Sequence, residues 1–389
     1  MKINLKFRGP GLNDTVRFLG LVSLCTDLAS KMVYPITPIF LTAVLGAPAW
    51  TVGVIEGLAE SAASLLKLYS GWLSDRTGQR KSLAVVGYGF GAISKLGLAF
   101  SMAWSHVLGA RLLDRIGKGL RAAPRDALIA ENCLPQQRGR AFGLHHSLET
   151  IGEIIGPLGG FFLLQYFAGN YRRVFAISFV PALLGVLILL TLVKEPRRTT
   201  IERRTRPQFT FRGLSADYRQ FLTVIVLFGI GNSSDAFLLL RAQDLGLQGV
   251  QLLLLYTAFN SVEVSLSLTV GNLSDRIGRR PLLISGYLVF AMVYGGFAIA
   301  QNTAVLWPLF MLYGLYSTLT RGVQKAWVAD LVHPERRGAE IGTFHMVVGL
   351  AALPASLIAG WLYTTIATSA PFYLSAGIAV LAALRLGVA

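Results

Sequence analysis

The sequence predicts an all-α integral membrane protein with twelve transmembrane helices, arranged as two pseudo-symmetric bundles of six. The first observation is composition, because the chain is 53% hydrophobic and only 14% charged, which is far more apolar than a soluble protein. The second is a series of apolar segments of about 20 residues, the length that crosses a bilayer. The third is a charged turn that occurs at 71–81 and again at 271–281. A turn repeated between equivalent segments indicates an internal duplication.

The apolar segments form one set before a polar stretch and a second set after it. The first set lies near residues 18–44, 50–73, 83–104, 106–130, 138–167 and 172–193. The second set lies near residues 218–241, 248–273, 282–301, 303–330, 337–364 and 369–388. The polar, basic residues 194–217 therefore predict a linker between an N-terminal bundle at 1–193 and a C-terminal bundle at 218–389.

The formal net charge of +16 lies mostly in short links between apolar segments. Arg76, Arg80 and Lys81 lie in one such link, whereas the opposite links at 45–49 and 302–304 contain no Lys or Arg. Basic links stay in the cytoplasm during membrane insertion, so we expect both termini and the linker to be cytoplasmic, in a bacterial inner membrane. This rule explains the positive charge without a nucleic-acid partner.

The repeated turn has the same order of glycines and charges in both copies. The shared positions are Gly71, Asp75, Arg76, Gly78 and Arg80 in the first copy and Gly271, Asp275, Arg276, Gly278 and Arg280 in the second. Gly78 and Gly278 allow the positive φ that a tight reversal needs. Asp75 ends a helix, where its charge is unfavourable beside the negative end of the helix dipole. Its carboxylate would be stabilised at the N-terminus of another helix.

These turns, with two segments of the first half, resemble the major facilitator superfamily. The turns match that family's signature loops between helices 2 and 3 and between helices 8 and 9. Residues 115–123, Arg-Ile-Gly-Lys-Gly-Leu-Arg-Ala-Ala, resemble its basic helix-4 motif, with Lys118 where a glutamine is usual. Residues 152–160, Gly-Glu-Ile-Ile-Gly-Pro-Leu-Gly-Gly, match the Gly-Pro motif associated with antiporters that export their substrates. The resemblance implies the major facilitator fold and transport by alternating access.

The resemblance also implies partners for the two aspartates of the turns. Asp75 is expected to face the start of helix 11 near Gly338, and Asp275 the start of helix 5 near Gly139. The arginines of the turns would complete ion pairs there and close the cytoplasmic face as a gating latch. The alternative is that the turns only set topology through their positive charge. We favour the latch because the carboxylate recurs in both halves.

Gly152, Gly156 and Gly160 are spaced by four residues, so they share one face of their helix. Small residues on a face allow another transmembrane helix to approach closely. Pro157 lacks an N–H group and loosens the helical hydrogen bonds beside it. We expect this packing to set the preference between inward-open and outward-open states. Ordinary small-residue packing is the alternative.

Ionisable residues within the apolar segments predict the substrate and proton sites, because charge is costly at membrane depth. The candidates are Asp27, Lys31, Glu56, Glu60, Arg115, Glu149, Glu153, Asp235 and Glu263. Several form i,i+4 pairs, so both members lie on one helix face that must point into the bundle. The alternative is a self-neutralising network in which Asp27 pairs with Lys31 or Arg115 and Asp114 pairs with Lys118.

Asp27, Glu149 and Glu153 are the preferred proton sites. A carboxyl group in a low-dielectric cavity holds its proton more tightly than in water, so it can load and release one near neutral pH. Glu149 also follows His145 and His146 by one helical turn. These three side chains could bind nickel, cobalt or zinc. A hydrogen-bonded histidine pair is the favoured interpretation.

These residues predict a secondary transporter that exports a small molecule, drug-like or a metabolite, by proton antiport. We expect no enzyme activity and no cofactor. The sequence has no Walker-type loop for ATP hydrolysis, so an ion gradient is the expected energy source. The alternatives are an exporter of a nickel- or cobalt-type divalent cation, an exporter of a siderophore, and a passive channel. We expect a monomer in the lipid bilayer.

If the turns form a latch, Asp75→Asn and Asp275→Asn should each favour the inward-open state. A carboxylate at a helix N-terminus contributes about 1 kcal/mol or more when partly buried, enough to shift a balanced equilibrium about fivefold. Labelling of single cysteines on the cytoplasmic side of helices 5 and 11 measures the shift. Unchanged labelling in both variants would reduce the turns to topology signals.

Overall fold

The computed structural model describes residues 13–134, 137–195, 214–331 and 337–388, and within these ranges the regular structure is helical. The first half contains α1 (Asp14–Val33), η1 (Tyr34–Ile36), α2 (Thr37–Ile39), η2 (Phe40–Val44), α3 (Trp50–Thr77), α4 (Arg80–Ala99), α5 (Trp104–Glu131), α6 (Arg138–Tyr166) and α7 (Tyr171–Thr191). The second half contains α8 (Ala216–Gly231), α9 (Ala236–Asp244), α10 (Gly249–Ile277), α11 (Arg279–Ile299), α12 (Leu306–Leu331), α13 (Arg337–Thr365) and α14 (Ala370–Val388).

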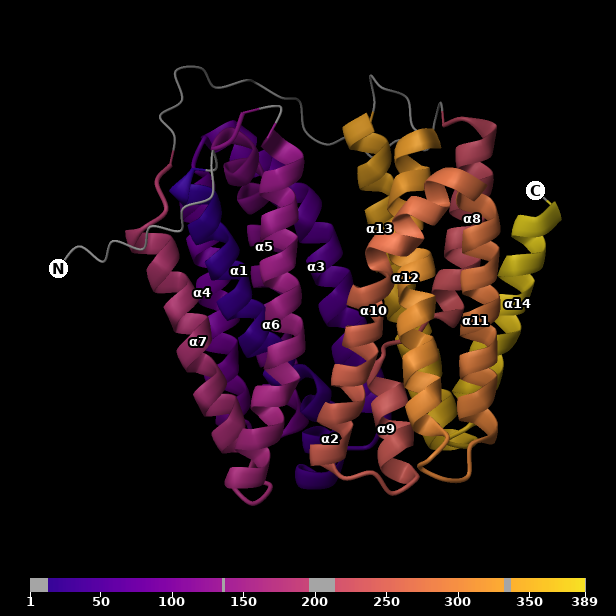
Figure 1. Ribbon diagram of the computed structural model, residues 1–389. Helices are drawn as coiled ribbons and strands as arrows, with labels where there is room; N and C mark the ends of the chain where they lie inside the picture. Colours follow the sequence, from indigo (N-terminus) through magenta and orange to yellow (C-terminus); the bar gives the residue numbers. More distant parts are fainter. Residues whose placement is uncertain (1–12, 135–136, 196–213, 332–336, 389) are drawn as a thin grey trace.

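The helices stand side by side in two groups (Figure 1). The long helices from α1 to α7 pack on one another, as do those from α8 to α14, and between the groups α3 packs along α13 and α6 along α10. Helix α1 begins and α14 ends at the same end of the bundle, which we call the N/C end; the opposite end, with α2 and α9, is the far end. The exact domain boundaries stay a prediction, because most of the predicted linker lies outside the described residues.

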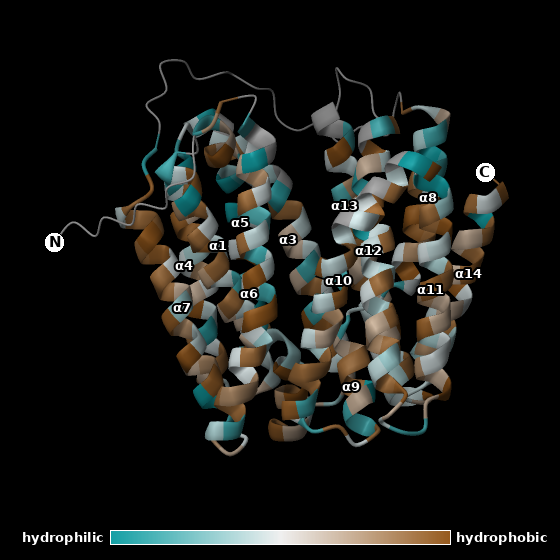
Figure 2. Cartoon of the chain, in the orientation of Figure 1, coloured by the Kyte–Doolittle hydropathy of each residue, from teal (hydrophilic) through white to brown (hydrophobic). Residues whose placement is uncertain are grey.

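Eight described helical segments are long and apolar enough to cross a bilayer. They are Arg80–Ala99, Arg140–Tyr166, Tyr171–Thr191, Ala216–Asp244, Gly249–Ser267, Arg279–Ile299, Glu340–Thr365 and Ala370–Val388. Helices α1, α3, α5 and α12 are more polar, and the first three carry charges such as Asp27, Glu56 and Arg111. The count of twelve spans therefore stays a prediction. Figure 2 shows hydrophobic residues along the bodies of the helices and hydrophilic residues gathered toward the N/C end.

Two predicted spans are interrupted in the structure. The first breaks after Val33, and short helical turns carry the chain past Pro35 and Pro38, as these prolines predict. The second break separates α8 from α9 at residues 232–235 and was not predicted. Asp235 precedes α9 directly, so the break places a carboxylate beside a helix N-terminus, where the helix dipole favours it.

The repeated turns have the backbone that their glycines predict. The φ angle is +69° at Gly78 and +92° at Gly278, in the region that a residue with a Cβ rarely adopts. Arg80 Nη1 lies 2.6 Å from Glu131 Oε2 of α5. The first turn is thereby tied to the end of a neighbouring helix.

The second turn is tied to α14. Arg280 donates hydrogen bonds to the carbonyl oxygens of Leu386 and Gly387, both at 2.8 Å. A cation at a helix C-terminus is stabilised by the helix dipole and by the free carbonyl groups. The latch contacts of Asp75 and Asp275 lie outside the described side chains, so the latch stays a prediction.

The glycines of the Gly-Pro motif let α6 approach α1 closely, as predicted. A Cβ added at Gly152, Gly156 or Gly160 would lie 2.6, 2.7 or 2.9 Å from a backbone carbonyl oxygen of α1, nearer than any real side chain can come. This contact places Asp27 and Lys31 directly against α6. The packing face of the motif is therefore also the face that carries ionisable groups.

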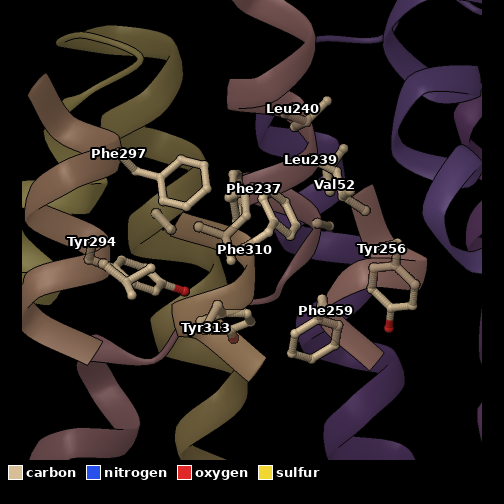
Figure 3. Packing of buried hydrophobic residues seen from close by; sticks show 14 of the residues in the cluster. Val52, Phe237, Leu239, Leu240, Tyr256, Phe259, Tyr294, Phe297, Phe310 and Tyr313 are labelled. Atoms are coloured by element: carbon tan, nitrogen blue, oxygen red, sulfur yellow. The ribbon is translucent and has the colours of Figure 1, made fainter. Parts of the chain in front are cut away.

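A hydrophobic core joins the two halves toward the far end. Figure 3 shows Val52 of α3 beside Phe237 and Leu239 of α9, with Tyr256 and Phe259 of α10 nearby. All five are buried in one hydrophobic cluster. Helices within a bilayer associate through van der Waals packing rather than through removal of apolar surface from water, so the packing of this cluster stabilises the contact between the halves.

Gly156→Ala should destabilise the protein, because the new methyl group would meet the Leu28 carbonyl oxygen at 2.7 Å and Lys31 Cβ at 2.9 Å. Overpacking of this kind costs about 1–3 kcal/mol. The midpoint of thermal unfolding in detergent measures the loss. Gly143→Ala on the same helix is the control, since nothing lies within 4 Å of its added Cβ. Equal midpoints for the two variants would contradict the close-packing interpretation.

Candidate functional site

A cavity of about 450 Å³ lies between the two halves, near the middle of the helices. Its walls come from α1, α3, α5 and α6 on one side and from α8, α10, α12 and α13 on the other. The predicted candidates that line it are Asp27, Lys31, Glu56, Glu60, Arg115, Glu153 and Asp235. The structure therefore brings together most of the charged residues selected from the sequence, and their roles stay predictions.

The most buried charges of the cavity wall form a network across α3, α4 and α5. Arg111 Nη2 donates to both carboxylate oxygens of Glu56, at 2.6 and 2.9 Å. Lys95 Nζ lies 2.9 Å from Asp114 Oδ1, and Arg111 Nη1 lies 3.7 Å from Asp114 Oδ2. Each buried charge thus has an opposite charge beside it, as burial in a low-dielectric interior requires. This network holds the three helices in a fixed arrangement.

Two i,i+4 ion pairs of the alternative, self-neutralising network are not formed. Asp114 pairs with Lys95 of α4 rather than with Lys118, and Lys31 pairs with Glu153 of α6, Nζ to Oε1 3.1 Å, rather than with Asp27. The physical reason is that a partner on a closely packed neighbouring helix is held in place by both backbones. An i,i+4 pair along one helix contributes only a few tenths of a kcal/mol.

Asp27 is a carboxylate that has no partner in this network. Its side chain is half-buried and lines the cavity, and within the described part of the chain it has neither a hydrogen bond nor an ion pair. The charges that act on it are Glu149 and Glu153 of α6 and Lys118 and Arg121 of α5. Asp27 is therefore placed to exchange a proton or to receive a cationic group.

The wall from the second half combines aromatic residues with polar ones. Phe228, Tyr256, Tyr313 and Tyr316 line the cavity there, and the Tyr313 hydroxyl donates a hydrogen bond of 2.6 Å to Asp235. Aromatic faces provide apolar contact together with an attraction for cations. The first half thus lines the cavity mainly with charged groups, whereas the second half lines it with aromatic and polar groups.

Two predicted candidates lie outside the cavity lining. Glu149 accepts a hydrogen bond of 2.7 Å from Arg125 Nη1, and Arg125 also contacts Asp126 at 2.9 Å. Glu263 lies 3.4 Å from Arg321 Nη1. Both carboxylates form ion pairs outside the cavity lining. They are therefore less suited to bind a ligand directly than Asp27 or Glu153, which line the cavity.

The histidine pair of α6 is divided between the interior and the surface. His145 Nε2 lies 2.8 Å from Ser23 Oγ, and its side chain is buried. The His146 side chain is 72% exposed, and both rings approach Glu149. Among the residues with described positions, no three His, Cys, Asp or Glu side chains are grouped to hold a metal ion. His145 joins α6 to α1 by this hydrogen bond, and the role of the histidine pair stays a prediction.

Sequence reasoning missed the aromatic wall. Tyr313 and Tyr316 are three residues apart, as are Tyr256 and Phe259, so each pair shares a helix face. That spacing was the available signal. It was not decisive, because aromatic residues in an apolar segment face lipid as readily as a cavity.

The halves are in contact on the far side of the cavity. Thr42 Oγ1 lies 3.5 Å from Gln243 Oε1, between η2 and α9 at the far end. Beside the cavity itself, the Ser61 hydroxyl donates a 2.7 Å hydrogen bond to the Gly349 carbonyl oxygen, between α3 and α13. In Figure 1 the two groups lie closest together near α2 and α9 and diverge toward the N/C end. The structure therefore represents a state that is closed at the far end.

Known proteins resemble the chain over most of its length. The sequence model of the Major Facilitator Superfamily matches residues 19–260 and 221–389. The uncharacterized MFS-type transporter MJ1317 of Methanocaldococcus jannaschii is 35% identical, over 90% of this chain and 89% of its own. Multidrug resistance protein MdtH of Salmonella newport is 24% identical, over 89% of this chain and 86% of its own. The POT family transporter PepTSo shares the fold, with a TM-score of 0.81 at 11% identity and coverage of 97% and 98%.

Glu56→Gln should reduce the folded yield, because it leaves Arg111 buried with a weaker partner. Breaking a buried ion pair costs about 3–5 kcal/mol, and the Glu56 side chain is only 8% exposed. Glu60→Gln is the matched control, since that side chain is 50% exposed. Size-exclusion chromatography of the solubilised variants measures the folded fraction. Equal yields would show that the network does not contribute to stability.

Proposed function

The chain belongs to the Major Facilitator Superfamily and is a multi-pass membrane transporter, and we propose that it exports a small organic molecule in exchange for protons. The proposal rests on the cavity between the halves. Its buried network of charges across α3, α4 and α5 is paired, whereas Asp27 lines the cavity without a hydrogen bond or ion pair among the described residues. A transport site has to bind cargo and release it again. An unpaired carboxylate beside an aromatic wall can do both as its protonation changes.

Asp27 is the proposed proton site. Charges of both signs act on its carboxylate, positive from Lys118 and Arg121 of α5 and negative from Glu149 and Glu153 of α6. These opposed influences suit a group that must both load and release a proton. Glu153 is less suited, because Lys31 holds it at 3.1 Å.

Proton binding at Asp27 is coupled to the two halves through α1. Asp27 lies one helical turn before Lys31, and the glycine face of α6 holds this part of α1 in close contact. Lys31 Nζ also lies 3.5 Å from the Tyr256 hydroxyl of α10, in the other half. A change of charge at Asp27 therefore acts next to a contact that joins the halves, and it can bias the equilibrium between open and closed states.

We propose that the N/C end faces the cytoplasm, in the inner membrane of a bacterial cell, and that the protein acts as a monomer. The basic links of the sequence support this orientation. The far end would then face outward, and the closed far end of the structure corresponds to an inward-facing state. The latch formed by the repeated turns would close the cytoplasmic side in the opposite state.

Export and a drug-like cargo are the favoured direction and substrate class. The Gly-Pro motif of α6 supports export, and its glycines make the close contact with α1 that the motif requires. The similarity to a multidrug resistance protein supports an organic cargo. The metal-cation alternative gains no support from the described residues, because no three ligand side chains are grouped among them.

Asp27→Asn should abolish uphill transport and retain exchange of labelled for unlabelled cargo, because the variant cannot cycle a proton but can still alternate. The comparison is made in proteoliposomes with and without an imposed pH gradient. Asp14→Asn, on the same helix but with a side chain that is 71% exposed, is the control and should transport normally. Gradient-driven uphill transport by Asp27→Asn would remove Asp27 from the proton pathway.

The same experiment separates a carrier from a passive channel. With a carrier, unlabelled cargo inside the vesicles accelerates uptake of labelled cargo. The reason is that the binding site then returns to the outside loaded with unlabelled cargo instead of empty. A pore equilibrates the label and shows no such acceleration. Absence of counterflow in the wild-type protein would overturn the proposal of alternating access.

A further inference from the structure

A second cavity, of about 420 Å³, lies at the far end of the first half and shares no lining residue with the cavity between the halves. Its walls come from η2, from the turn between α6 and α7, and from the start of α7, and this turn lies at the same end as α2 (Figure 1). The lining residues are Phe40, Val44, Phe167, Ala168, Gly169, Asn170, Tyr171 and Arg172. Most of these side chains are apolar or aromatic, and Arg172 carries the one charge among them.

Arg172 lines this far-end cavity with part of its hydrogen-bonding capacity unused. Its Nη2 donates a hydrogen bond of 3.0 Å to the Ser101 carbonyl oxygen, and its Cζ lies 5.8 Å from the centre of the Phe40 ring. These two contacts hold the side chain at the cavity wall. Among the described residues Nε and Nη1 have no hydrogen-bond partner, and Arg172 has no ion pair. The N–H groups of a guanidinium match the oxygen atoms of a phosphate group in geometry and charge.

The turn between α6 and α7 brings a second arginine to the same place. The Asn170 side chain caps α7 by accepting a hydrogen bond of 3.2 Å from the Arg173 backbone N–H. Before it, Ala168 has a φ of +48°, a left-handed conformation that few residues with a Cβ adopt. Arg173 Cζ lies 5.3 Å from the centre of the Phe167 ring, which lines the cavity. Two positive charges therefore lie at a mostly apolar hollow.

Basic side chains are otherwise scarce at the far end. The links without any Lys or Arg are 45–49, 100–103, 245–248, 300–305 and 366–369. Arg241, near the end of α9, donates hydrogen bonds to two carbonyl oxygens and one hydroxyl group of the protein, so its charge is already solvated within the fold. Within the described part of the far end, Arg172 and Arg173 are the basic residues available to a ligand.

Helix α7 places this cavity at the level of lipid headgroups. The helix is apolar enough to cross a bilayer, and it has 21 residues. At about 1.5 Å per residue it extends about 30 Å, which equals the thickness of the hydrocarbon core, about 30 Å. The first turn of α7, with Arg172, therefore lies where hydrocarbon meets headgroups. Near the end of α6, Phe162 and Tyr166 are 65% and 81% exposed, and such aromatic side chains are typical of this interface.

We propose that the far-end cavity binds the headgroup of an anionic phospholipid, with the phosphate on Arg172 and the glycerol backbone against Phe40, Val44 and Phe167. The apolar lining favours a lipid over a free, strongly hydrated phosphate ion. None of the lining residues is acidic, so the ammonium group of a zwitterionic lipid would lie beside two arginines without a partner. This site is independent of the cargo and of the proton.

The test maps where a phospholipid binds on the full chain in detergent. The probe is phosphatidylglycerol with a photoreactive diazirine near its glycerol backbone, and mass spectrometry of the digested protein locates the cross-links. Arg172→Gln removes the proposed phosphate ligand, whereas Val44→Trp fills the cavity and leaves Arg172 in place. Arg219→Gln is the matched control, since Arg219 is an exposed arginine of α8 at the N/C end.

The wild-type protein and the control should be cross-linked within residues 40–44 or 162–172, and unlabelled phosphatidylglycerol should displace the probe there better than phosphatidylethanolamine. Arg172→Gln loses a charge-assisted hydrogen bond, so half-maximal labelling of this region should need at least about tenfold more probe. Val44→Trp should weaken the same labelling. Cross-links at the N/C end of the same molecules should not change, which separates the effect from a general loss of folding.

Absence of far-end cross-links in the wild-type protein, or labelling that Arg172→Gln leaves unchanged, would overturn the proposal. Equal displacement by phosphatidylethanolamine would contradict the preference for an anionic headgroup. Inorganic phosphate or lipid-free glycerophosphoglycerol that displaces the probe as well as phosphatidylglycerol does would identify a site for soluble anions and contradict the phospholipid. None of these results depends on transport, so the proposed function stands or fails separately.

Discussion

Charged side chains within the helical bundle have to find partners, and the arrangement of the first half follows from this requirement. Glu56, Arg111, Asp114 and Lys95 satisfy one another across α3, α4 and α5. Between α1 and α6 the pair of Lys31 and Glu153 does the same at 3.1 Å. Because these groups are satisfied inside the protein, the helices that carry them are held around the cavity. Among the described carboxylates that line the cavity, Asp27 alone has no such partner, which is why we propose it as the proton site.

The two halves contribute different side chains to the cavity. The first half supplies fixed charges, whereas the second supplies an aromatic wall and a broken helix, α8 and α9, with Asp235 at the break. The close approach of α6 to α1 at three glycines connects the charge chemistry to helix packing. In the proposed mechanism, a proton at Asp27 would act beside this contact between two helices that cannot move apart without losing that packing. Such a contact is suited to an equilibrium between two discrete states.

The sequence predicted the elements that depend on local pattern. The break at Pro35 and Pro38 and the glycine face of α6 follow from residue type and spacing alone, and the structure confirms them. Choice of ion-pair partner does not follow from spacing. Lys31 and Asp114 bind residues of neighbouring helices, which only the packing of the whole bundle brings within reach. The aromatic wall was missed for the same reason, because lipid-facing and cavity-facing tyrosines look alike in sequence.

Reversible cross-linking of the far end tests alternating access most directly. Thr42→Cys and Gln243→Cys would place thiols at a contact between η2 and α9, where the wild-type side chains lie 3.5 Å apart. The native Cys25 and Cys133 are replaced first. Cross-linking should stop exchange of any compound that the uncross-linked protein exchanges, and reduction should restore it, because the far end has to open in each cycle. Exchange at an unchanged rate in the cross-linked protein would contradict the proposed mechanism.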